Sequence, residues 1–131
     1  MRRFGAIWAI LAVSLVIGGC DRSERLTAQN KGIVGYVDRV VSAIYRAEGA
    51  ERASVPYGMV NDRYCMDEPG MCRYLARVTV QNTLKRWELA GKPKEFIAFL
   101  GDRYCPVGAD NDNGSNRHWI SNVRYFMEMG S

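Results

Sequence analysis

The first regular pattern of apolar positions runs from Ile33 to Ala47. Its apolar residues recur at steps of three and four: Val34, Val37, Val41 and Ile44. This spacing marks one face of an α-helix. The next step of the series reaches Glu48, and Gly49 follows as a typical residue just beyond a helix end. We therefore predict a helix over 33–47 with a carboxyl group at the end of its buried face.

Three further helices are predicted, over about 71–90, 94–104 and 116–129. The side chains expected to face inward are Leu75, Val78, Leu84, Trp87, Phe96, Ile97, Leu100, Trp119, Val123, Phe126 and Met127. Residues 50–70 have no helical period and contain several turn signals, which indicates short extended pieces with a small hairpin. The predicted fold class is mostly α, with four helices and a small non-helical or β-hairpin lobe after the first helix.

The first 20 residues follow a different pattern, that of an export signal. Two arginines precede an apolar run from Phe4 to Ile17, and small residues and Cys20 come next. The run is shorter than the ~20 residues that comfortably span a bilayer. Its ending, VIGGC, resembles a bacterial lipobox, which implies cleavage before Cys20 and a lipid on that cysteine. An ordinary signal peptide cut near Gly19, or an uncleaved anchor, is the alternative.

This interpretation divides the chain into a signal peptide (1–19), a polar tether (20–32) and one domain (33–131). Asp21 resembles an inner-membrane retention signal, so we expect a lipoprotein anchored at the periplasmic face of the inner membrane. The chain has 18 basic and 14 acidic residues, and two of the basic ones, Arg2 and Arg3, leave with the signal peptide. The remaining charge is nearly balanced and does not indicate a nucleic-acid partner.

Exported cysteines are free to form disulfides. Cys65 and Cys72 flank a Pro69-Gly70 turn signal, so a bridge between them is the favoured pairing. Cys105 would then be a free, buried thiol. Pairing of Cys105 with either of the other two is the alternative.

Several kinds of catalytic site find no support in the sequence. His118 is the only histidine and is expected at the surface, and no Cys-x-x-Cys or His-x-x-x-His spacing is present for zinc. The loop around Asp110 and Asp112 lacks the ligand spacing of a calcium loop. Serine-nucleophile and phosphate-binding motifs are also missing. We expect no metal and no other cofactor.

Carboxylate chemistry remains, and Glu48 is its leading candidate. Burial on the apolar stripe and the negative end of the helix would both raise the pKa of Glu48. A raised pKa is what a general acid needs near neutral pH. The alternative is a glutamate that turns to solvent or pairs with Arg46 or Arg52.

Four segments, in order, resemble the lysozyme-like superfamily, and in particular small phage and bacterial lytic transglycosylases. They are AIYRAEG with the following PYGM, then VQNTLKRW, then FIAFLGDRYCP, and finally an asparagine-containing loop with NRHWISNVRYF. The resemblance covers about Val34 to Met127. It implies an α+β lysozyme-like domain that cleaves the glycan strands of peptidoglycan, with Glu48 as general acid and base.

The candidates for contact with the glycan are aromatic, glycine and amide residues: Tyr57, Gly58, Asn82, Tyr104, Asn116, Trp119 and Asn122. For Asn82 an interior, hydrogen-bonded amide is the alternative, and for Trp119 a core position.

Two positions depart from the soluble transglycosylase pattern. Gly49 stands where a serine follows the glutamate, and Val60 stands where a glutamine is expected. They favour the alternative function, a non-catalytic lipoprotein of lysozyme-like shape that binds peptidoglycan or an envelope protein. A small entry-exclusion or secretion-system lipoprotein is a third possibility.

Overall fold

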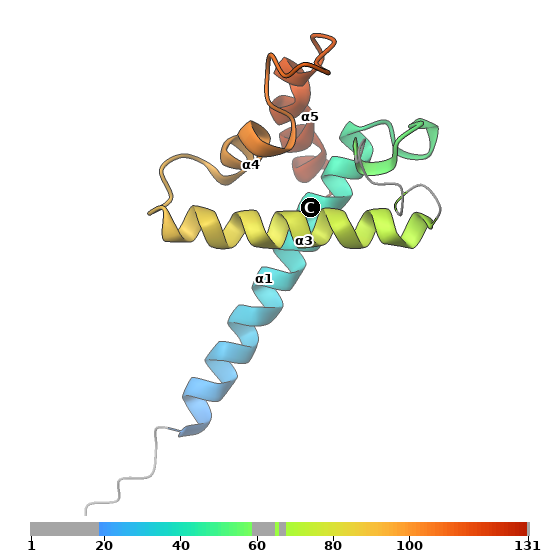
Figure 1. The fold of residues 1–131 in the computed structure, drawn as a ribbon. Coiled ribbons are helices and arrows are strands. Elements are labelled where there is room, and N and C mark those ends of the chain that lie inside the picture. The colour runs from blue at the N-terminus through green and yellow to red at the C-terminus, as the bar shows by residue number, and fades with distance from the viewer. Residues whose placement is uncertain (1–18, 59–64, 66–67, 131) are drawn as a thin grey trace, which may run out of the picture. The chain divides into compact units, whose positions relative to one another are not determined.

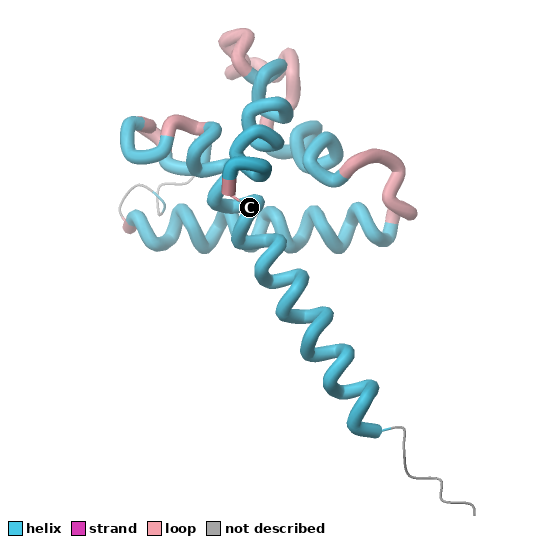
Figure 2. Tube along the Cα trace, turned by 180° about the vertical axis from the view of Figure 1, so that it is seen from behind, coloured by secondary structure: helices cyan, strands magenta, loops and turns pink. Residues whose placement is uncertain are grey.

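The computed structural model describes residues 19–58, 65 and 68–130, with the backbone alone for 19–21 and 69. Its helices are α1 (Gly19–Ala47), α3 (Pro69–Leu89), α4 (Phe96–Tyr104) and α5 (Asn116–Met129), with two 3₁₀ turns, η1 (Ala50–Arg52) and η2 (Pro56–Gly58) (Figure 1). The mostly α class is confirmed, since these described residues contain no strand (Figure 2). The expected hairpin is not seen in the described part of 50–70. Residues 59–64 and 66–67, and the signal peptide at 1–18, lie outside the described residues.

The chain divides into two units, residues 1–31 and 32–131. In the first unit, residues 19–31 are helical, so α1 begins at Gly19 and not at Ile33 as predicted. The segment expected as a tether is rich in good helix formers and holds no proline, which explains why the helix extends through it. The side chains of residues 22–31 are exposed. The side chains of Cys20 and Asp21, on which the lipid and retention predictions rest, lie outside the described residues.

No helix within the described ranges is long and apolar enough to cross a membrane.

The core of the second unit forms where α3 crosses α1 (Figures 1 and 2). Val37, Val41 and Ile44 are fully buried on α1, as predicted. Val34 was predicted to be buried but is 44% exposed. The fully buried positions of α1 begin one turn later, at Val37, and the neighbouring Asp38 accepts a hydrogen bond at its Oδ1 from Nη1 of Arg77 on α3 at 2.6 Å. Val34 therefore lies beyond the area that α3 covers.

The buried face of α3 differs from the predicted one. Its fully buried line consists of small residues: Cys72, Ala76, Val80 and Thr83. Three of the large residues predicted there, Leu75, Leu84 and Trp87, are only partly buried against the core. Short side chains allow the axes of two crossing helices to approach closely, and longer ones pack around the contact. The most deeply buried line on α3 therefore consists of small residues.

The last two helices follow the prediction closely. Phe96, Ile97 and Leu100 are buried on α4, and Trp119 and Val123 are buried on α5. Helix α4 begins at Phe96 because the Glu95 side chain caps it, accepting hydrogen bonds from the backbone N–H groups of Ile97 and Ala98 at 3.0 Å. Gly101 lets α5 approach α4, since a methyl group there would lie 2.7 Å from Cγ1 of Ile120.

A disulfide links Cys65 to Cys72 at the start of α3, which confirms the favoured pairing. Both cysteines are buried, and Cys105 is a half-buried free thiol.

We predict that the double variant Cys65→Ala/Cys72→Ala loses ~2–3 kcal/mol of unfolding free energy, because the bridge closes a short loop in the unfolded chain. Urea unfolding of the oxidised wild type and the variant measures the loss. The matched control is Cys105→Ala, which keeps the bridge and should therefore lose as much stability on reduction as the wild type does. Equal midpoints for the oxidised wild type and the double variant would contradict the prediction.

Candidate active site

Glu48 lies immediately beyond the last residue of α1. Its backbone N–H still donates to the Ile44 carbonyl at 2.9 Å, so its position continues the helical stripe. The chain then turns at Gly49, where φ is +103°. A left-handed backbone of this kind favours glycine. Glu48 thus lies at the end of the buried face of α1, as predicted.

The carboxyl group of Glu48 is half-buried and is held by α5. The indole Nε1 of Trp119 donates a hydrogen bond to Oε1 of Glu48 at 2.8 Å. Burial raises the pKa of Glu48 and the hydrogen bond from Trp119 lowers it less, so the pKa lies above its ordinary value. Within the described part of the chain the carboxyl group makes no ion pair, and the alternative of a partner at Arg46 or Arg52 is not realised.

Gly58 closes in on the other side of this carboxyl group. A methyl group built at Gly58 would lie 2.9 Å from Cδ of Glu48. Gly58 has a φ of +66°, and Tyr57 before it has a φ of +58°. The strained backbone at Tyr57 is anchored twice: its carbonyl accepts a hydrogen bond from the Tyr104 hydroxyl at 2.5 Å, and its ring lies 5.0 Å from that of Tyr45. The chain at η2 is therefore fixed where it touches Glu48.

Tyr104 also supports the indole that holds Glu48. The rings of Tyr104 and Trp119 are stacked, with centroids 5.2 Å apart. Burial, with a smaller contribution from the nearby Glu48, holds the pKa of Tyr104 well above its ordinary value. Tyr104 is thus a neutral hydrogen-bond donor at any physiological pH.

The loop between α4 and α5 is organised by Asp112. Its carboxylate accepts hydrogen bonds from the backbone N–H groups of Gly108 and Gly114 at 2.8 Å and of Asn116 at 3.2 Å. These hydrogen bonds lower the pKa of Asp112. The side-chain amide of Asn116 donates to the Pro106 carbonyl at 2.8 Å. The carboxylate of Asp112 thus holds the loop together.

A groove of about 170 Å³ lies between the end of α1, η2, the end of α4 and the loop that follows α4, and Glu48 is part of its lining. The other lining residues are mostly polar or small: Gly58, Tyr104, Cys105, Pro106, Asn111, Asn113, Ser115 and Asn116. Burial, followed by the charges of Glu48 and Asp112, raises the pKa of the Cys105 thiol to about 11. A neutral thiol is a poor nucleophile. The groove thus offers one acid with a raised pKa among amide and hydroxyl groups.

The predicted glycan contacts divide into three groups. Gly58, Tyr104 and Asn116 line the groove. The side chains of Tyr57 and Trp119 are buried behind it, so Trp119 takes the core alternative. Asn82 and Asn122 are exposed and are not among the described residues that line the groove. On their helices they lie away from the buried positions, Thr83 on α3 and Val123 on α5.

Sequence reasoning missed the contribution of the loop before α5, including Asn111, Asn113 and Ser115. Its turn-rich composition indicates only a loop. The available signal was its position, directly between Tyr104 and Trp119.

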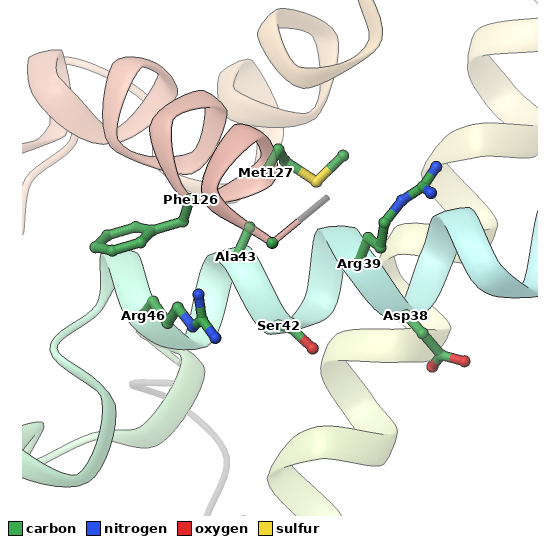
Figure 3. Close-up of a pocket in the computed structure, with 8 residues that line it drawn as sticks. Asp38, Arg39, Ser42, Ala43, Arg46, Phe126 and Met127 are labelled. Carbon is green, nitrogen blue, oxygen red and sulfur yellow. The ribbon is translucent and has the colours of Figure 1, made fainter.

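A second hollow of about 260 Å³ lies between α1 and α5 (Figure 3). Phe126 and Met127 of α5 lie beside Ala43 of α1, and Arg39 and Arg46 flank the hollow along α1. Its carboxylate, Asp38, is ion-paired with Arg77. Because this carboxylate is already paired, we assign the candidate chemistry to the groove at Glu48.

No protein-family model, curated protein or solved structure matches the chain. The chemistry of the site therefore rests on its own geometry.

We predict that Gly58→Ala destabilises the domain more than Gly108→Ala does. Both glycines have a positive φ, at +66° and +80°, which costs an alanine about 1–2 kcal/mol. Only at Gly58 would the methyl group also displace the Glu48 carboxyl, because nothing lies within 4 Å of the one at Gly108. Urea unfolding of the two variants isolates this contact. Equal losses of unfolding free energy in the two variants would show that the Glu48 carboxyl group can move aside at no cost.

We also predict that Glu48→Gln stabilises the domain in a pH-dependent way. The raised pKa means that the folded state favours neutral Glu48, and this contribution is lost as pH rises through the folded-state pKa. Glutamine stays neutral and keeps an oxygen for the Trp119 N–H. The difference in unfolding free energy should therefore be small near pH 4 and grow toward pH 8. Urea unfolding across that range measures it, and a difference independent of pH would refute the interpretation.

Proposed function

We propose that this protein cleaves the glycan strands of peptidoglycan, with Glu48 as general acid and base, and that it is tethered to the membrane as a lipoprotein. The observation that carries the proposal is the state of Glu48: its pKa is raised by burial, and it lies in a groove lined by amide and hydroxyl groups. A protonated carboxyl group can deliver its proton to a glycosidic oxygen. Neutral amides and hydroxyls are suitable partners for the uncharged polar groups of a sugar.

In the first step, Glu48 gives its proton to the oxygen that links N-acetylmuramic acid to N-acetylglucosamine, and the glycosidic bond breaks. Glu48, now a carboxylate, then takes a proton from the nucleophile that attacks the sugar. If the nucleophile is the C6 hydroxyl of the same muramic acid, the product is an anhydro sugar; if it is water, the product has a reducing end. Among the described lining residues Glu48 is the only carboxyl group. Hydrolases usually use two, which favours the anhydro product.

A second candidate function is that of a non-catalytic lipoprotein that binds peptidoglycan or an envelope protein. One observation favours it: Gly49 follows the glutamate where the resembled enzymes have a serine. The groove is also small, at about 170 Å³. This size suits a binding site, because a binding site needs no room for a leaving group.

Digestion of purified peptidoglycan tests the proposal. The full chain in detergent is compared with Glu48→Gln, and soluble products are identified by mass spectrometry. We expect release of anhydro-muropeptides by the wild type and a loss of at least ~100-fold in Glu48→Gln, the usual scale of general acid catalysis. Reducing-end products would assign a hydrolase instead.

The matched control is Glu51→Gln, which makes the same change at an exposed glutamate and should retain the wild-type rate. Release of nothing by the wild type, together with retention on insoluble peptidoglycan, would support the binding function.

A further inference from the structure

We propose that Trp119 is a positioning residue for Glu48: its indole N–H occupies Oε1, so that Oε2 is the oxygen that carries the proton of the acid. This inference rests on the proposed role of Glu48 as the general acid. It gives Trp119 a function other than contact with the glycan.

The direction of the hydrogen bond decides where the proton lies. The indole nitrogen of Trp119 is 2.8 Å from Oε1 of Glu48. An indole N–H can donate a hydrogen bond but cannot accept one. Oε1 must therefore accept in both states of the carboxyl group. In the neutral state the carbonyl oxygen of a carboxyl group is the stronger acceptor, so Oε1 takes that role and the hydrogen lies on Oε2, which leaves a single oxygen to deliver the proton.

The indole ring has little freedom to turn away from Glu48. Trp119 is only 4% exposed. Tyr104 stacks on the ring at 5.2 Å and is itself held by its hydrogen bond to the Tyr57 carbonyl. On the side of α4, a methyl group at Gly101 would lie 3.4 Å from Cε3 of Trp119, so the helix backbone is close. The donor is therefore fixed in place before any substrate binds.

Gly58 limits the carboxyl group from another direction. Built from Gly58, a methyl group would lie 3.0 Å from Oε1 and 3.1 Å from Oε2 of Glu48. The carboxyl group is thus confined between an indole donor and a backbone without a side chain. Because Trp119 does not line the groove, it acts through Glu48 and not on the glycan.

The variant Trp119→Phe removes the donor and keeps an aromatic ring for Tyr104 to stack on. We expect kcat for glycan cleavage to fall by ~10- to 100-fold through loss of orientation, with KM unchanged. The hydrogen bond lowers the pKa of Glu48, so its loss should raise that pKa. Carbon-13 NMR of the Glu48 carboxyl group, and a shift of the alkaline limb of the kcat profile to higher pH, measure the change.

Trp87→Phe is the matched control. The indole N–H of Trp87 also donates a hydrogen bond, to the Lys94 carbonyl at 2.6 Å, but Trp87 is not among the described residues that line the groove. It should lower stability without moving the pKa of Glu48 or KM. A folded Trp119→Phe protein with an unchanged Glu48 pKa would overturn the proposal.

A measurement on the wild-type protein, in which both tryptophans are intact, tests the proposal even if Trp119→Phe does not fold. The indole N–H resonance of Trp119 in the wild type should titrate with the pKa of Glu48 and stop doing so in Glu48→Gln, while that of Trp87 should not follow it. A Trp119 resonance that ignores the titration would refute the contact. These NMR results do not depend on cleavage, so inactivity toward peptidoglycan would count against the proposed function alone.

Discussion

The half-buried carboxyl group of Glu48 is the point on which the organisation of the site depends. A carboxyl group removed from water needs a hydrogen-bond donor or a proton, and here it has a donor from Trp119 and a raised pKa. It also needs space, which Gly58 provides by having no side chain. The end of α1 and η2, which are close in sequence, and the distant α5 are thus held to one another around a single ionisable group.

The surrounding scaffold makes this arrangement rigid. Tyr104 connects two parts of it, since its ring stacks on Trp119 and its hydroxyl holds the strained backbone of Tyr57. Asp112 holds the loop that completes the groove through three backbone N–H groups. A general acid benefits from such preorganisation, because the donor geometry needs no rearrangement as the reaction proceeds. The same features keep an ionisable group half-buried at a cost to stability.

The groove and the second hollow differ in the chemistry that they offer. The hollow between α1 and α5 is larger, but its acid is already paired with Arg77 and its arginines are exposed (Figure 3). The groove contains one acid, Glu48, which is not ion-paired within the described residues. The other groups that line it are neutral, so they neither cancel the charge of Glu48 nor compete for its proton. Size alone would thus favour the hollow, whereas the pairing of the ionisable groups favours the groove.

The sequence by itself determined the four helices, most of the inward residues of α1, α4 and α5, and the position of Glu48 at the end of a buried stripe. These follow from helical periodicity and from end signals that lie within a few residues of one another. It also indicated the Cys65–Cys72 bridge, which closes over a short turn.

Only the tertiary structure decided which face of α3 is buried, the left-handed backbone at Tyr57, and the partnership of Trp119 with Glu48. The extension of α1 through residues 19–31 was missed for another reason, because a polar segment of good helix formers shows no apolar stripe. The rest arises from contacts between segments tens of residues apart. Such contacts leave no periodic trace in the chain, and their geometry is set by how closely the helices can approach.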